Sequence, residues 1–185
     1  SESAILVDGN NAVRNDDGGN ITLAAEGVDK TDSLTIQSDV TVTGGDAVLD
    51  DDGNINLVAG GDVELDDTVV DVVVSTDAFG QVVIAAGTDY DDYPTSLALA
   101  NGNADGDLLM DDGTEASTDD GQIVLLATGS VALSIVDADD DGADADDGSV
   151  LIVAEYTGVL GGLGTPDGTI TDNLTSSEAV NVNAG

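Results

Sequence analysis

A short phrase recurs along this chain: an acidic residue or pair, a glycine, a small polar residue and then alternating aliphatic residues. The clearest copies are Asp16–Leu23 (DDGGNITL), Asp51–Leu57 (DDGNINL) and Asp119–Leu125 (DDGQIVL). Looser copies are Phe79–Ile84, Asp146–Ile152 and Asp167–Thr171. Each copy is typical of a turn followed by a β-strand. The glycines that precede the strands, at 19, 53, 80, 121, 148 and 168, are 34, 27, 41, 27 and 20 residues apart, so the repeat is irregular.

Further strand-like runs lie between the copies, and no segment shows the sustained 3.6-residue period of an amphipathic helix. These runs are Ser33–Thr43, Asp62–Leu65 and Ser130–Val136. Short strands at uneven intervals suit a coil of stacked turns, because extra residues leave at the turns without disturbing the strands. The predicted fold is therefore an all-β parallel β-helix, or β-solenoid, formed as a single unit over residues 1–185. A β-sandwich gives the same alternation and is the alternative.

The apolar residues also favour a thin column of strands. Hydrophobic residues make up 41% of the chain but aromatic residues only 2%, so Val, Leu, Ile and Ala must form the core. Such side chains fit repeated pleated layers, whereas globular cores usually take much of their buried area from aromatic rings. The length of 185 residues allows eight or nine turns of a coil. With neither cysteine nor histidine, a disulfide framework is excluded, and zinc and haem sites are not expected.

The charge excludes whole classes of partner. The chain has 39 acidic and 2 basic residues, for a formal net charge of -37. Binding to nucleic acid or to an anionic membrane needs Lys and Arg to displace counterions, so neither partner is expected. Membrane insertion is not expected either, because the longest apolar stretch, Ile123–Val136, is interrupted at Thr128–Ser130 and is too short to span a bilayer.

Stacked acidic turns need positive charge from solution. Neighbouring strands lie about 4.8 Å apart, and two carboxylates at that distance repel by about 0.9 kcal/mol in water and about 3.5 kcal/mol at an effective dielectric near 20. Arg14 and Lys30 are too few to neutralise such a ladder. Calcium is the expected cation, because it takes six to eight oxygens from carboxylates and carbonyls in flexible loops. Solvated turns with diffuse counterions are the alternative.

Two stretches have the spacing of irregular calcium loops. Asp137–Asp144 has Asp at relative positions 1, 3 and 5 and glycine at position 6, as an EF-hand loop does. The other stretch is Asn101–Asp112. Both lack the glutamate of an EF-hand at the twelfth position. The acidic pairs of the repeated phrase are further candidates. The predicted metal ligands are Asp137, Asp139, Asp141 and Asp144, then Asp105, Asp107 and Asp112, and the pairs Asp51 and Asp52, Asp119 and Asp120, and Asp146 and Asp147.

The phrases GNITLAAEG, GNINLVAGGDVEL and GQIVLLATGSVAL, with the closing GTITDNLTSSEAVNVNAG, resemble repeats of the filamentous-haemagglutinin type. Such repeats occur in very large secreted bacterial β-helix proteins. The likeness covers most of the chain from Asn10 to Gly185, although each motif is short. It implies a right-handed parallel β-helix that serves as an exported adhesin or stalk, extracellular or at the cell surface. The aspartate load departs from the usual pattern and suggests a cation-dependent or salt-adapted variant.

The functional prediction is a structural subunit or repeat of an extracellular filament, assembled head to tail from copies of itself and stabilised by calcium or other cations. Joining Asn181–Gly185 to Ser1–Val7 gives another strand, turn and strand, as expected for one period of a longer array. One alternative is a calcium-dependent adhesin segment that binds a surface glycan or protein through its loops. Another is a halophile surface-layer component. An enzyme is not expected, because the chain lacks histidine and has few basic or aromatic residues to bind a substrate.

Overall fold

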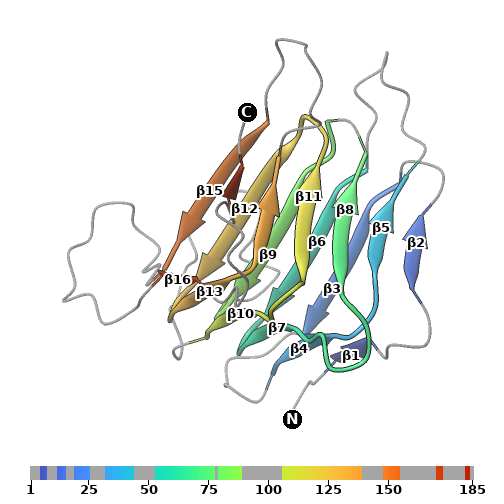
Figure 1. Ribbon diagram of the computed structural model, residues 1–185. Helices are drawn as coiled ribbons and strands as arrows, with labels where there is room; N and C mark the ends of the chain where they lie inside the picture. The colour runs from blue at the N-terminus through green and yellow to red at the C-terminus, as the bar shows by residue number, and fades with distance from the viewer. Residues whose placement is uncertain are drawn as a thin grey trace.

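The chain forms a column of parallel β-strands (Figure 1). The computed structural model describes residues 5–7, 12–15, 19–25, 32–43, 53–77, 79–88, 106–138, 148–154, 170–172 and 182–183. Within these ranges all regular secondary structure is β-strand, and every strand pair is parallel. The predicted all-β parallel β-helix is therefore confirmed, and the alternative of a β-sandwich, which is built from antiparallel sheets, is wrong. No helix long and apolar enough to cross a membrane occurs in the described ranges.

The strands belong to three sheets, which we call A, B and C, and the chain visits them in that order in each turn. Sheet A contains β1 (Ile5–Val7), β4 (Leu34–Ile36), β7 (Val63–Leu65), β10 (Leu108–Met110), β13 (Val131–Leu133) and β16 (Ile170–Asp172). Sheet B contains β2 (Val13–Asn15), β5 (Val40–Val42), β8 (Val73–Thr76), β11 (Glu115–Thr118), β14 (Ile135–Asp137) and β17 (Val182–Asn183). Sheet C contains β3 (Ile21–Ala25), β6 (Ile55–Ala59), β9 (Val82–Ala86), β12 (Gln122–Ala127) and β15 (Ser149–Val153).

The described strands make five full turns and begin a sixth, fewer than the eight or nine turns that the length allows. The reason is that each turn is long. Leu34 and Val63, which are neighbours in sheet A, are 29 residues apart, and Val63 and its next neighbour Leu108 are 45 apart. The additional residues lie between strands, as predicted for a solenoid with connections of variable length.

The glycine of the repeated phrase lies at the corner where the chain enters sheet C. Partners in sheet C follow the spacing of the glycines, since Ile55 pairs with Val82 and Val82 with Ile123, 27 and 41 residues further on. A Cβ atom on Gly80 would lie 2.7 Å from the carbonyl oxygen of Gly53, and one on Gly121 would collide with the carbonyl oxygen of Gly80. The corner therefore requires glycine, because successive turns approach too closely for a side chain.

The last copy of the phrase belongs elsewhere in the fold. Ile170, from the copy Asp167–Thr171, pairs with Val131 in sheet A. The earlier copies supply strands of sheet C, as Ile123 does. The sequence phrase thus marks the end of an acidic turn, and it does not by itself specify which sheet the next strand joins.

Two of the predicted strand runs each divide between two sheets. Ser33–Thr43 contains β4 in sheet A and β5 in sheet B, and Ser130–Val136 likewise contributes to β13 and β14. Between β4 and β5 the chain bends at Gln37–Asp39. The Asp39 carboxylate accepts a hydrogen bond from the backbone N–H of Val73, at 3.1 Å, and so links the bend to the following turn.

Aliphatic side chains fill the interior of the column, with one layer for each turn. Leu34, Val63, Leu108 and Val131 form one such row in sheet A, and all four are fully buried. Sheet C differs from the other two because its outer face is apolar as well. A second buried cluster there contains Val58, Val83, Ala85, Val124 and Leu126. Strands buried on both faces read as continuous aliphatic runs, which explains the runs in β9 and β12.

Candidate cation-binding corner

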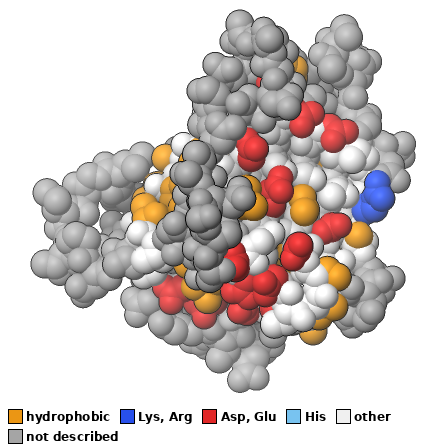
Figure 2. Space-filling view, viewed as in Figure 1, with side chains coloured by type: hydrophobic (Ala, Val, Ile, Leu, Met, Phe, Trp, Pro, Cys, Tyr) orange, Lys and Arg blue, Asp and Glu red, His pale blue; other side chains and the backbone are white. Residues whose placement is uncertain are grey.

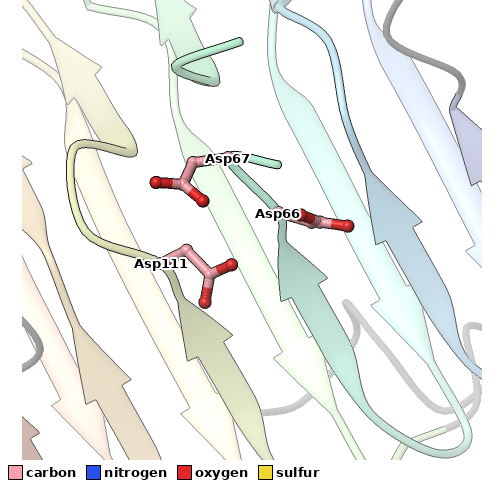
Figure 3. A group of neighbouring side chains, drawn as sticks. All are labelled: Asp66, Asp67 and Asp111. Atoms are coloured by element: carbon pink, nitrogen blue, oxygen red, sulfur yellow. The ribbon is translucent and has the colours of Figure 1, made fainter. Parts of the chain in front are cut away.

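Three carboxylates meet at the corner between sheets A and B (Figure 3). Asp66 and Asp67 directly follow β7, and Asp111 directly follows β10. Because Leu65 pairs with Met110 in parallel register, the residues that follow them lie side by side at the same corner. One oxygen from each of the three carboxylates lies within 4.8 Å of the others, and all three side chains are half-buried. We call this group the acidic triad.

Hydrogen bonds hold Asp66 in place. Gln37, which follows β4 in the turn below, donates its amide N–H to Asp66 Oδ2 at 2.6 Å. The backbone N–H of Thr68 donates to Asp66 Oδ1 at 2.8 Å. These hydrogen bonds from Gln37 and Thr68 stabilise the carboxylate, and they lower the pKa of Asp66 below its ordinary value of 3.8.

A tight turn positions Asp111. Its carbonyl oxygen accepts the backbone N–H of Thr114 at 3.0 Å and the Thr114 hydroxyl at 2.8 Å. Gly113 has a φ of 92°, in the left-handed region that glycine adopts without strain. The N–H of Gly113 donates to the hydroxyl of Ser134 in the following turn at 3.1 Å. The backbone next to Asp111 is therefore held by hydrogen bonds within its own turn and by one to the following turn.

The electrostatics of the corner oppose full ionisation. Burial raises the pKa of Asp111 above 3.8, the charges of Asp67 and Asp66 raise it further, and a hydrogen bond with the Asp67 backbone offsets part of the rise. Burial also raises the pKa of Glu64, on β7, above 4.5, with further contributions from Asp66, Asp111 and Asp62. Two of these acids are therefore easier to protonate than in water, whereas Asp66 is harder to protonate.

The chemistry open to this corner is the binding of a hard cation. Three carboxylates can supply three oxygens or more of the six to eight that calcium takes, and the half-buried position leaves room for water to supply others. Acidic side chains are spread across the face seen in Figure 2, and basic side chains are visible only at one edge. Arg14 is part of β2 in the first turn, whereas the acidic triad joins the third and fourth turns. Among the described residues, no basic side chain belongs to the two turns that form the acidic triad.

The described candidates of the sequence analysis lie around the column. Asp107 precedes β10, and its carboxylate accepts the backbone N–H of Ser130 at 2.7 Å, which links two turns. Asp112 follows Asp111 directly but is not a member of the acidic triad. Asp119 and Asp120 lie between β11 and β12. Asp137 is the last residue of β14 on sheet B and pairs with Ser117.

The other candidates lie outside the described residues: Asp51, Asp52, Asp105, Asp139, Asp141, Asp144, Asp146 and Asp147. Their role as metal ligands stays a prediction, as does that of the five candidates that the structure describes. In the described part of the chain, the acidic triad is the group of three acids close enough to share an ion, and none of its members is among the metal ligands predicted from the sequence.

A signal for the acidic triad was present in the sequence. Asp62–Asp67 reads DVELDD and Asp107–Asp112 reads DLLMDD. In both, an aspartate precedes a three-residue strand and an aspartate pair follows it. The structure aligns the two segments in adjacent turns, and Asp62 Oδ1 accepts the backbone N–H of Asp107 at 2.8 Å. A comparison of these two segments would have predicted a carboxylate cluster at the point where the strands end.

Comparison with known proteins identified no matching family model, no similar curated protein and no similar solved structure. The filamentous-haemagglutinin-type resemblance therefore rests on the quoted sequence phrases alone.

Proposed function

We propose that this chain is a structural unit of an extracellular filament or stalk, in which β-solenoid columns stack end to end and calcium or another cation balances the acidic corner. The unit has a mechanical role and no catalytic one. The extracellular location follows from the resemblance to secreted β-helix repeats. The fold supports the proposal because each turn of a parallel column presents backbone hydrogen-bonding groups and aliphatic side chains to the next turn.

The observation that carries this proposal is the exposure of core positions in the last described turn, on β16 and β17. Ile170 pairs with Val131 and Val182 with Val136, so the register gives all four the same inward orientation. Val131 and Val136 are 0% and 1% exposed, whereas Ile170 and Val182 are 54% and 37% exposed. Aliphatic side chains on a core row gain free energy when a further turn covers them, at about 25 cal/mol for each Å² buried.

Electron microscopy of the purified chain at physiological salt and calcium tests this proposal. We expect rods longer than one unit, and monodisperse single units under these conditions would contradict it. Ile170→Asp should shorten or abolish the rods, because it buries a charge at the junction. Val69→Asp is the matched control, since Val69 is 55% exposed but lies on the side of the column between β7 and β8. An equal loss of rods in both variants would also contradict the proposal.

The cation part of the proposal has its own test. Calcium should raise the midpoint of thermal unfolding at concentrations far below those at which potassium chloride acts, because three close carboxylates hold a divalent ion better than diffuse counterions do. Circular dichroism would follow both titrations, and the two salts are compared at equal ionic strength. If potassium chloride at equal ionic strength stabilises the fold as much as calcium does, the acids serve solubility in brine, as in the halophile alternative.

A further inference from the structure

The last described strands of the three sheets lie at different heights. Those of sheets A and B are β16 and β17, both in the sixth turn, whereas that of sheet C is β15 in the fifth turn. β15 pairs with β12 over five residues, from Ser149 to Val153. On its other side β15 pairs with no strand in the described ranges. Within the described ranges, the column therefore ends in a step that is one strand lower at sheet C.

The backbone of β15 presents hydrogen-bonding groups to this step. The N–H of Ser149 donates to Gly121 O on the β12 side, at 3.1 Å. Because successive residues of a strand direct their N–H groups to opposite sides, those of Val150 and Ile152 are directed away from β12. The first turns confirm this pattern, since Ile21, in the same register column as Val150, donates its N–H to Asn54 O of the next turn, at 2.9 Å.

Side chains on both faces of β15 are less covered than those of the strand before it. In β12, Ile123, Val124, Leu125 and Leu126 are all buried. Their partners Val150, Leu151, Ile152 and Val153 are half-buried. Val150 and Ile152 pack against the main core, whereas Leu151 and Val153 pack against the second cluster on the outer face of sheet C. The loss of cover on β15 thus affects both faces, as expected for a strand with a missing neighbour.

We propose that the free edge of β15 is a strand-acceptor site, which takes one further parallel strand of about five residues with aliphatic side chains on both faces. Continuity with sheet C specifies this ligand, because β9 and β12 have that character and pair in the same register. The identity of the donor rests on the proposed function: the strand comes from the next unit of the column. The added strand completes the sixth turn, so that all three sheets then end in the same turn as β16 and β17.

A synthetic peptide with the sequence of β12 and its turn, residues 119–128, is the probe. Fluorescence anisotropy of labelled peptide should show saturable binding to the whole chain at a stoichiometry of one. In the register of sheet C, the peptide's N–H groups at positions 124 and 126 are directed toward β15, and those at 123 and 125 are directed away from it. N-methylation at 124 and 126 should weaken binding at least tenfold, and N-methylation at 123 and 125 should change it by no more than about twofold.

The two N-methylated peptides are matched in size and hydrophobicity, and the protein is the same in both measurements, so a folding defect cannot explain a difference. Equal binding of the two peptides, or no saturable binding of the unmodified one, would overturn the strand-acceptor site. Electron microscopy separates this inference from the proposed function. Rods that form without being shortened by excess unmodified peptide would overturn the acceptor site alone. Selective peptide binding to single units that form no rods would support the acceptor site and overturn end-to-end stacking.

Discussion

The close stacking of turns has opposite effects at sheet C and at the acidic corner between sheets A and B. Sheet C is buried on both faces, and its entry corner has glycines packed against backbone and amide side chains bonded from turn to turn, as Gln81 is to Gln122 at 2.7 Å. The acidic corner holds half-buried carboxylates that repel one another. Close stacking of turns therefore favours folding at sheet C, whereas at the acidic corner it brings like charges together and opposes folding.

The outer faces of sheet C and of sheet A, whose strands lead into the acidic corner, provide the largest test of this difference. Leu126 lies on the outer face of sheet C and is fully buried, whereas Leu109, between Glu64 and Ala132 on sheet A, is half-buried. Leu126→Ala should lower the free energy of unfolding by about 3 kcal/mol, and Leu109→Ala by about 1 kcal/mol. Urea unfolding at constant calcium measures both. Equal losses would mean that the outer face of sheet C is not a second core.

The glycine column gives the next largest effect. Gly121→Ala should cost about 2 kcal/mol in unfolding free energy, because its Cβ would meet the rigid backbone of Gly80. Gly19→Ala is the control, since that Cβ would meet only the flexible side-chain amide of Asn15, at 2.6 Å. We expect a change of no more than about 0.5 kcal/mol there. A tolerated Gly121→Ala would contradict the close stacking of this corner.

At the acidic corner, removal of a charge should stabilise the protein. Without divalent cations, Asp111→Asn should raise the free energy of unfolding by about 1 kcal/mol, a figure that allows for screening by solvent at a half-buried site. The same variant should lose most of the stabilisation that calcium gives. Asp77→Asn, directly after β8 at the corner before sheet C, is the control and should keep the calcium response, because Asp77 is exposed and is not a predicted metal ligand. If Asp111→Asn keeps it as well, the acidic triad is not the cation site.

The smallest effect is the pH dependence in the absence of cations. Glu64 and Asp111 have raised pKa values, so their contribution to stability is present below their ordinary values of 4.5 and 3.8 and is lost as pH rises through the folded values. Asp66, with its lowered pKa, contributes above 3.8 and loses that contribution in stronger acid. Thermal unfolding in EDTA should therefore show a higher midpoint just above pH 4 than at pH 7, and Glu64→Gln should flatten this slope. A midpoint that rises steadily to pH 7 would contradict these pKa directions.

The fold was predictable from sequence because a short phrase with a glycine precedes each described strand of sheet C. Gly80, Gly121 and Gly148 lie against the backbone of the preceding turn, and the spacing of the phrase reproduces the register from Ile21 through Val82 to Val150. The division of Ser33–Thr43 between two sheets was not predictable in the same way. Its bend at Gln37–Asp39 contains neither glycine nor proline, and a hydrogen bond from Val73, 34 residues beyond Asp39, links it to the next turn.

The acidic triad was missed for a related reason. Calcium loops are predicted from spacing along the chain, whereas a solenoid brings together residues from adjacent turns. Asp66 and Asp111 are 45 residues apart and become neighbours only through the register of β7 with β10. The irregular length of the turns hides such pairs from any search that uses a fixed period. Alignment of strand-flanking aspartates, as in Asp62–Asp67 and Asp107–Asp112, is the search suited to this fold.

Disulfide trapping tests the parallel, in-register column most directly, because the chain has no cysteine of its own. Ser75 and Ser117 are partners on adjacent strands of sheet B, with Cα atoms expected about 4.8 Å apart. Ser75→Cys with Ser117→Cys should form an intramolecular disulfide on mild oxidation. Thr41→Cys with Ser117→Cys should not, because those positions are two strands, or about 10 Å, apart. Crosslinking of the second pair as readily as the first would contradict the column.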